Sequence, residues 1–178
     1  DLKFNAPENS FKSVLSLIPA VYTQDFDDLT ASGNFELEGS LNGIYNGERE
    51  TYPAYQLAMK VSDGSFRYPA LPAGVTQVNV DLTVVNERSD LDGTVVNLRQ
   101  AKAKIADNPF EARFLLKNPI SDPDFNGSLK TNLNLANLNK VIPSEGFAYS
   151  GMVDADFQVA GVMSDINAER YESVQASG

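Results

Sequence analysis

The sequence contains neither cysteine nor histidine, and each absence excludes a class of chemistry. Without cysteine there is no disulfide framework, no thiolate metal site and no cysteine nucleophile. Without histidine there is no Ser-His-Asp triad, and the side chain best suited to proton transfer near neutral pH is missing. The enzyme chemistry that remains would need carboxylates, lysine, tyrosine or a carboxylate-bound ion. We expect a non-enzymatic protein that uses no cofactor.

Basic residues are also scarce. The chain has 14 of them against 24 acidic residues, which gives a net charge of −10. Such a surface repels phosphate backbones and anionic lipid headgroups, so we expect no nucleic-acid partner. The 178 residues suffice for one domain or for part of a larger one, and a hydrophobic content of 42% supports a packed core.

No long apolar run is present either. The longest, from Val14 to Val21, is far shorter than the ~20 residues that span a bilayer. The sequence begins at Asp1 rather than at methionine, and we interpret it as an excised or processed piece, which leaves open a membrane anchor elsewhere in its parent.

Periodicity predicts one convincing helix, near the N-terminus. Phe11, Val14, Leu15 and Ile18 share one helical face, Asn9 or Ser10 can cap its start, and Pro19 ends it. A short second helix is predicted near residues 135–142.

The rest of the chain alternates apolar and polar residues, beginning with residues 29–43, and turn signals separate successive runs. The alternation changes parity between Leu98 and Ala101, which predicts a β-bulge, and Asp63-Gly64 predicts a break or bulge in an earlier strand. Short polar turns between strands favour an antiparallel meander. We therefore predict a mainly β fold: a long, strongly curved meander sheet that forms a groove or an incomplete sandwich.

The predicted organisation has three parts: a helix and lead-in over residues 1–28, the main antiparallel sheet over 29–145, and the start of a next repeat over 146–178. The repeat is suggested by Tyr149-Ser150-Gly151, which resembles Ala31-Ser32-Gly33 before a similar alternating strand.

One continuous apolar side is expected if the strands form a meander. It is either an ordinary sandwich core or the wall of an open groove that binds acyl chains, and alternation is the same in both cases. The residues of this apolar set are Phe35, Leu37, Leu41, Leu57, Met59, Val78, Val80, Leu82, Val84, Phe110, Phe114, Leu116, Val153, Phe157 and Val159.

Two acidic motifs are weaker candidates. Asp122, Asp124 and Asn126 match the front half of a calcium loop, but position twelve is Leu133 instead of an acid, so we predict no metal site. Asp154 and Asp156 share the polar face of one strand, where paired carboxylates could serve glycoside hydrolysis, although a solvated strand face explains them better.

Several motifs, in order and spacing, resemble the AsmA-like family over nearly the whole chain from about Leu15. They are Ser32-Gly33 with Glu38-Gly39 and Asn42-Gly43, the stretch from Val61 to Pro72, Asn108-Pro109-Phe110, the stretch from Pro119 to Leu129, and Asn134-Leu135-Ala136-Asn137-Leu138.

The resemblance implies a segment of a Gram-negative periplasmic protein whose parent is anchored in the inner membrane and takes part in outer-membrane biogenesis. AsmA-like proteins are similar to bridge-like lipid-transfer proteins, so the implied partners are phospholipids or other acyl lipids, further segments of the same parent, and envelope proteins. The family implies no catalytic residues. The alternative is a structural or adhesive β-sandwich that binds protein or glycan, with Tyr45, Tyr52 and Tyr55 available for stacking.

Overall fold

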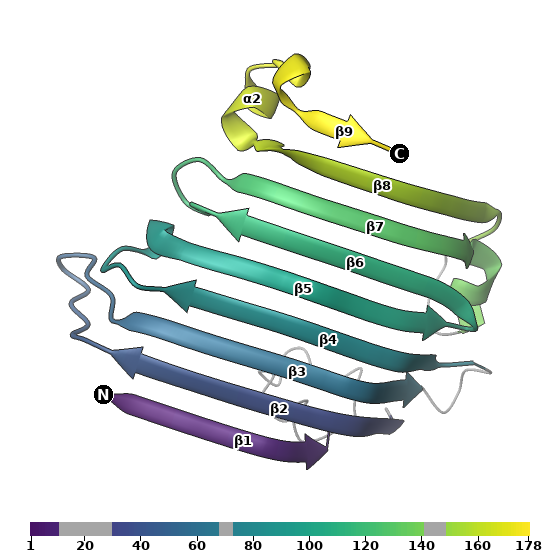
Figure 1. Cartoon of the computed structure of the whole chain (residues 1–178), viewed down its shortest axis with the longest axis horizontal. Coiled ribbons are helices and arrows are strands. Elements are labelled where there is room, and N and C mark those ends of the chain that lie inside the picture. Colours follow the sequence, from purple (N-terminus) through teal and green to yellow (C-terminus); the bar gives the residue numbers. More distant parts are fainter. Residues whose placement is uncertain (11–29, 68–72, 141–148) are drawn as a thin grey trace.

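The computed structural model describes residues 1–10, 30–67, 73–140 and 149–178, and these residues form one sheet of nine strands in the order of the chain. Every neighbouring pair is antiparallel, so the predicted meander is confirmed (Figure 1). The strands are β1 (Leu2–Ser10), β2 (Thr30–Asn42), β3 (Ala54–Arg67), β4 (Val75–Asn86), β5 (Thr94–Ile105), β6 (Asn108–Lys117), β7 (Asp124–Asn134), β8 (Met152–Val162) and β9 (Gln175–Ser177).

Helical structure in the described residues is confined to short connections. The α-helix α2 (Met163–Asn167) and the 3-10 helix η4 (Tyr171–Ser173) join β8 to β9, and η2 (Leu91–Gly93) precedes β5. The short helix predicted near residues 135–142 is present as the 3-10 helix η3 (Leu135–Lys140). None of the helices in these parts of the chain has the length and apolar character needed to cross a membrane.

The N-terminal helix predicted from Phe11, Val14, Leu15 and Ile18 lies outside the described residues. Its proposed capping positions, Asn9 and Ser10, are the last residues of β1. This strand lies in the segment predicted as a helix and lead-in. The strand forms because Leu2 and Phe4 alternate with Lys3 and Asn5, and it pairs with β2 from Leu2 opposite Leu41 onward.

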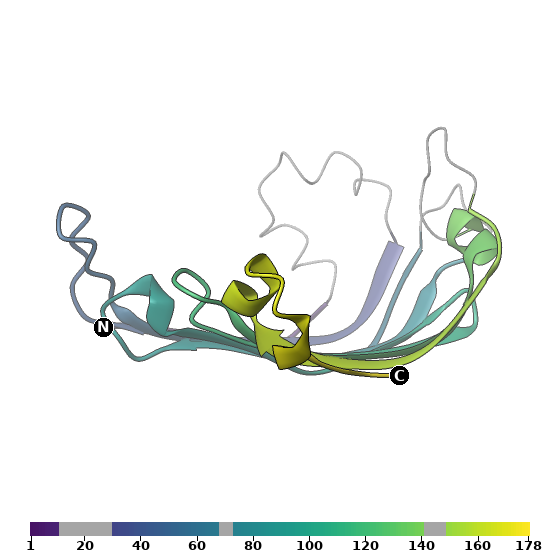
Figure 2. The same ribbon diagram turned by 90° about the horizontal axis from the view of Figure 1, so that it is seen from above.

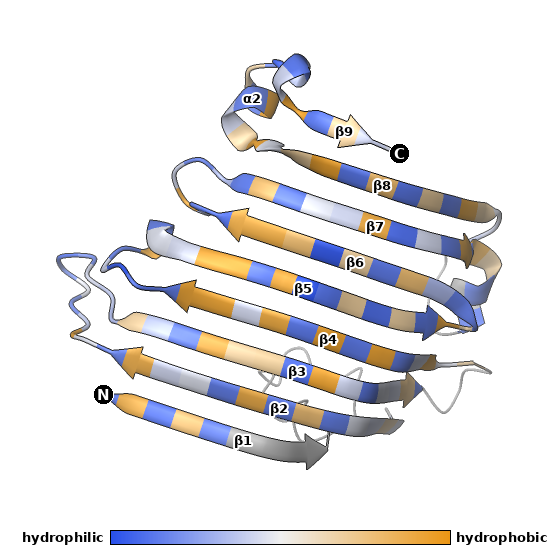
Figure 3. Ribbon diagram, in the orientation of Figure 1, coloured by the Kyte–Doolittle hydropathy of each residue, from blue (hydrophilic) through white to orange (hydrophobic). Residues whose placement is uncertain are grey.

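Both predicted irregularities are found in the sheet. The register between β5 and β6 shifts between Leu98 and Ala101, where the apolar residues change parity, and the register between β3 and β4 shifts at Gly64. Because each bulge adds one residue to one strand, the apolar side chains return to the same face after it. Apolar and polar residues alternate along much of each strand (Figure 3).

The strands lie in one layer when the sheet is seen from above (Figure 2). The residues 146–178, predicted to begin a further repeat, supply β8 and β9, which extend this same sheet. No second sheet covers it among the described residues.

Aromatic rings from neighbouring strands lie beside three glycines on the apolar side of the sheet. The Phe4 ring lies over Gly39, and the Phe114 and Phe125 rings contact the positions of Gly127 and Gly161. The Phe4 ring occupies the space that a Cβ atom would take at Gly39, whereas the other two rings lie in contact distance of their glycines, and Val174 is the nearest side chain at Gly161. The sequence alone does not identify these neighbours, because each ring comes from another strand.

Candidate functional site

The strand register places the whole apolar set on one face of the sheet. Directly paired residues lie on the same side, and the pairs run from Leu37 to Met59, Leu82, Leu98 and Phe114 across five strands. A second row runs from Phe35 through Val61 and Val80, and it reappears in β8 at Phe157. We call this side the apolar face.

The apolar face is only partly shielded. Phe35 and Val61 are 2% and 4% exposed, so the apolar face is buried at these positions of β2 and β3. Toward β8 the side chains open to solvent, with Phe114 39%, Val153 38% and Phe157 42% exposed. Large apolar side chains left accessible on one side of a sheet are typical of a surface that receives another apolar body.

Several members of the apolar face are not in the predicted set. Leu2 and Phe4 join it from β1 and are 55% and 41% exposed. Val96 and Leu98 join it from β5, paired with Leu116 and Phe114. Their alternation was readable in the sequence, but Leu2 and Phe4 belong to a run of only a few residues, and the bulge interrupts the run in β5.

The opposite face carries a row of charges that alternate in sign. Lys102, Glu111, Lys130 and Asp156 are consecutive cross-strand partners on β5 to β8. Lys102 Nζ lies 3.4 Å from Glu111 Oε2, and Lys130 Nζ donates to Asp156 Oδ2 at 2.7 Å. The hydrogen bond to Asp156 raises the pKa of Lys130. Opposite charges in register favour this strand pairing over a slipped one.

A hollow of about 510 Å³ lies over this charged row, and its lining includes Lys104 on β5, Pro109 on β6 and Asp154 on β8. Asp154 accepts a hydrogen bond from Asn132 Nδ2 at 3.2 Å, so each of the paired carboxylates is held by its neighbour on β7. Both are exposed. A hydrolase would need one of them buried enough to hold a proton near neutral pH, and this exposed face gives no such burial.

The calcium-like motif is divided between a loop and a strand. Asp122 lies in the connection before β7 and accepts from Ser164 N–H and Oγ at 2.8 and 2.7 Å, whereas Asp124 and Asn126 lie in β7. A calcium loop wraps its ligands around the ion, which an extended strand does not do. The described residues contain no group of three acidic side chains able to hold a metal ion.

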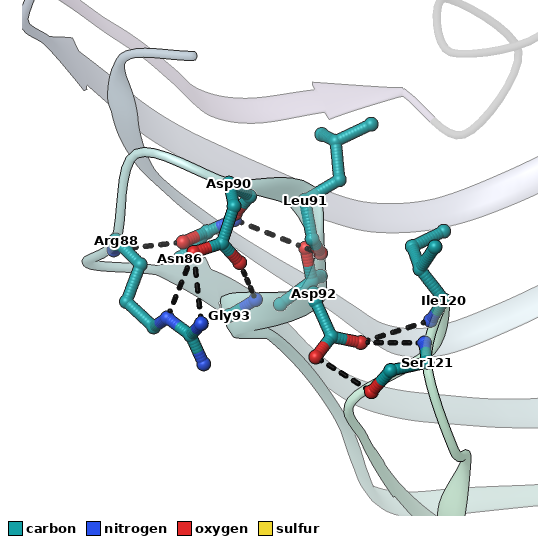
Figure 4. Close-up of polar contacts among 9 residues, drawn as sticks. Asn86, Arg88, Asp90, Leu91, Asp92, Gly93, Ile120 and Ser121 are labelled. Carbon is teal, nitrogen blue, oxygen red and sulfur yellow. Dashed lines mark hydrogen bonds and ion pairs between the residues drawn. The ribbon is translucent and has the colours of Figure 1, made fainter. Parts of the chain in front are cut away.

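A polar cluster fixes the connection between β4 and β5 (Figure 4). Asn86 is 1% exposed; its amide donates to the Asp90 carbonyl oxygen at 2.6 Å and its Oδ1 accepts from Arg88 N–H at 2.8 Å. Asp90 in turn caps η2 by accepting from Gly93 N–H. Local side-chain to backbone bonds of this kind hold a loop in one conformation.

Asp92 joins this connection to the one between β6 and β7. Its Oδ1 accepts from Ser121 N–H at 2.8 Å and from Ile120 N–H at 3.2 Å, and its Oδ2 accepts from Ser121 Oγ at 2.8 Å (Figure 4). The two bonds from Ser121, backbone first, lower the pKa of the Asp92 carboxyl. Asp92 is therefore a clasp between two loops that lie 29 residues apart in sequence.

No protein-family model, no curated protein and no solved structure matches the chain.

Proposed function

We propose that this chain is a periplasmic segment of an AsmA-like protein, and that its apolar face is one wall of a conduit for phospholipid acyl chains. The parent would be anchored in the inner membrane and serve outer-membrane biogenesis, without an enzymatic step or a cofactor. The observation that carries the proposal is the one-sided sheet, with Phe114, Val153 and Phe157 exposed on its apolar face and charges on the other.

The mechanism is partition. An acyl chain that leaves water for such a face gains ~0.8 kcal/mol for each methylene buried. The residues of the apolar set are hydrocarbon side chains apart from the Met59 thioether, so they offer no site for a particular headgroup. A lipid can then slide along the face, because each step exchanges one apolar contact for another.

The proposal includes curvature of the sheet. Register shifts in β2–β3, β3–β4, β4–β5 and β5–β6 support it, because bulges bend and twist the strands that contain them. The upward turn of the strand ends in Figure 2 supports it as well. A curved wall would surround an acyl chain on more than one side and so bury more of it.

The alternative, an adhesive β-sandwich, is favoured by one observation. Tyr45 and Tyr52 form a tilted ring pair with centroids 5.7 Å apart in the connection between β2 and β3, and Tyr45 is exposed. Exposed tyrosine rings can stack on a glycan or on a protein surface.

The lipid proposal is tested by binding. The protein is purified from a bacterial envelope, extracted with organic solvent and analysed for phospholipid by mass spectrometry, and binding of a fluorescent phosphatidylethanolamine is titrated. Phe157→Asp places a charge on the apolar face, and we expect it to weaken lipid binding about tenfold or more, since a buried carboxylate opposes the apolar contact.

The matched control is Gln158→Asp, the next residue of β8, which lies exposed on the charged face. It adds the same carboxylate and should leave lipid binding unchanged. Circular dichroism of both variants establishes that the sheet is folded. A wild-type protein without bound lipid, or equal losses in both variants, contradicts the proposal, and binding on a glycan array would favour the adhesive alternative.

A further inference from the structure

Four connections meet at one end of the sheet. They are residues 43–53 between β2 and β3, 87–93 between β4 and β5, 118–123 between β6 and β7, and 163–174 between β8 and β9. An antiparallel meander places alternate connections at the same end, and Figure 1 shows these four along one side of the sheet. We call them together the loop rim.

Hydrogen bonds join each connection of the loop rim to the next. Tyr52 N–H donates to the Ser89 carbonyl oxygen at 2.8 Å, which links the first pair. The Asp92 clasp on Ser121 links the second connection to the third. Asp122 links the third to the fourth in the same way, because it accepts hydrogen bonds from the N–H and the hydroxyl of Ser164. Two equivalent aspartate–serine clasps therefore hold the loop rim as one continuous surface.

This surface displays large apolar side chains to solvent. Ile44 is 80% exposed, Ile120 68% and Tyr171 64%, and each comes from a different connection. Further exposed side chains of the loop rim are Tyr45, Leu91 and Met163. Leu91 and Ile120 lie on either side of the Asp92 clasp in Figure 4. None of these residues belongs to the apolar face, so lipid binding there does not account for them.

Charge decides what such a surface can receive. The four connections contain nine acidic and three basic residues, a net charge of −6, which is more than half of the −10 of the whole chain. An anionic membrane surface would be repelled. A partner with basic side chains around apolar ones would be attracted, and apolar anchors within a charged rim are typical of protein–protein interfaces.

We propose that the loop rim is a docking surface for a protein segment that presents apolar side chains flanked by lysine or arginine. The preformed clasps lower the cost of binding, because the loops are ordered before the partner arrives. Ile44, Ile120 and Tyr171 are the anchors, and the surplus carboxylates select the basic partner.

The test uses a fluorescein-labelled amphipathic peptide of leucine and lysine, with a leucine–glutamate peptide of the same pattern as its counterpart. Fluorescence anisotropy should show binding of the lysine peptide alone. Replacing the three anchors by serine (I44S, I120S, Y171S) should weaken it about tenfold or more, as loss of interface anchors does. The matched control, M152S, removes an exposed apolar side chain of β8 that lies outside both the loop rim and the apolar face, and it should have little effect.

A second pair of variants tests the charge argument. Glu87→Lys with Glu172→Lys reverses two exposed carboxylates of the loop rim, and Glu36→Lys with Glu38→Lys makes the same change of net charge on the exposed face of β2. We expect weaker peptide binding for the first pair than for the second. Three results would overturn the proposal: no binding by the wild type, equal effects of both pairs, or anchor-dependent binding to phosphatidylcholine vesicles in place of the peptide. The first and third leave the lipid proposal for the apolar face untouched, because that proposal rests on Phe157.

Discussion

At the scale of single residues, the feature with the clearest solution signature is Asp92. Its carboxylate accepts three hydrogen bonds from Ile120 and Ser121, and they are possible in full only while it is charged. Because its folded pKa lies below its ordinary value, the clasp adds stability above the unfolded pKa of about 3.8, and that contribution is lost as pH falls through the folded value.

We therefore expect Asp92→Asn to lower the melting temperature at pH 7, and the difference from wild type to shrink as pH falls below about 4. Circular dichroism melts across this range measure it. Asp107→Asn serves as the control, because it removes an exposed carboxylate at the opposite end of the sheet. A gap of constant size down to pH 2 would show that the Asp92 charge contributes nothing to the clasp.

At the scale of the elements, two glycines allow the cost of backbone strain to be measured apart from the cost of steric crowding. Gly33 in β2 and Gly151 before β8 both have positive φ, at 121° and 105°, where other residues are strained. A methyl group at Gly33 would lie 2.5 Å from the Gly64 Cα, whereas at Gly151 it would meet nothing within 4 Å.

Gly151→Ala should cost about 1 kcal/mol of unfolding free energy, from strain alone. Gly33→Ala should cost roughly 2–4 kcal/mol, since β2 and β3 must also move apart where their register shifts. Urea denaturation with a common m-value measures both. Equal costs would mean that β3 yields to the added methyl group without penalty.

Sequence alone predicted the elements better than their contacts. The parity change at Leu98 and Ala101 was enough to place a bulge, because side chains must return to the apolar face. The strand β1 was missed, since the alternation of Leu2 and Phe4 is short and gains its meaning only from pairing with β2. The clasps could not be predicted from the sequence, because Asp122 and Ser164 are 42 residues apart and only the sheet register brings them together.

At the scale of the whole molecule, surplus negative charge opposes compactness. The exposed pairs, such as Lys130 with Asp156, contribute little each, while the net charge of −10 acts over the entire sheet. Added salt screens both the attraction within these ion pairs and the repulsion from the net charge, and the repulsion is the larger effect.

We therefore expect the melting temperature to rise by roughly 2–4 °C, or about 1 kcal/mol, between low salt and physiological ionic strength. Scanning calorimetry at several sodium chloride concentrations measures it, with potassium glutamate as a check on ion-specific effects. A falling melting temperature would mean that the alternating charge row outweighs the general repulsion.

The odd number of strands fixes how two such sheets can join. The described residues form nine antiparallel strands, so β1 and β9 run in the same direction. A translated copy would therefore meet β9 with a parallel β1, whereas a copy related by a dyad perpendicular to the sheet would set β9 against β9 in antiparallel fashion. In the dyad arrangement the apolar faces of both copies point the same way, so such a pair would double the breadth of the hydrocarbon-lined surface without inverting it.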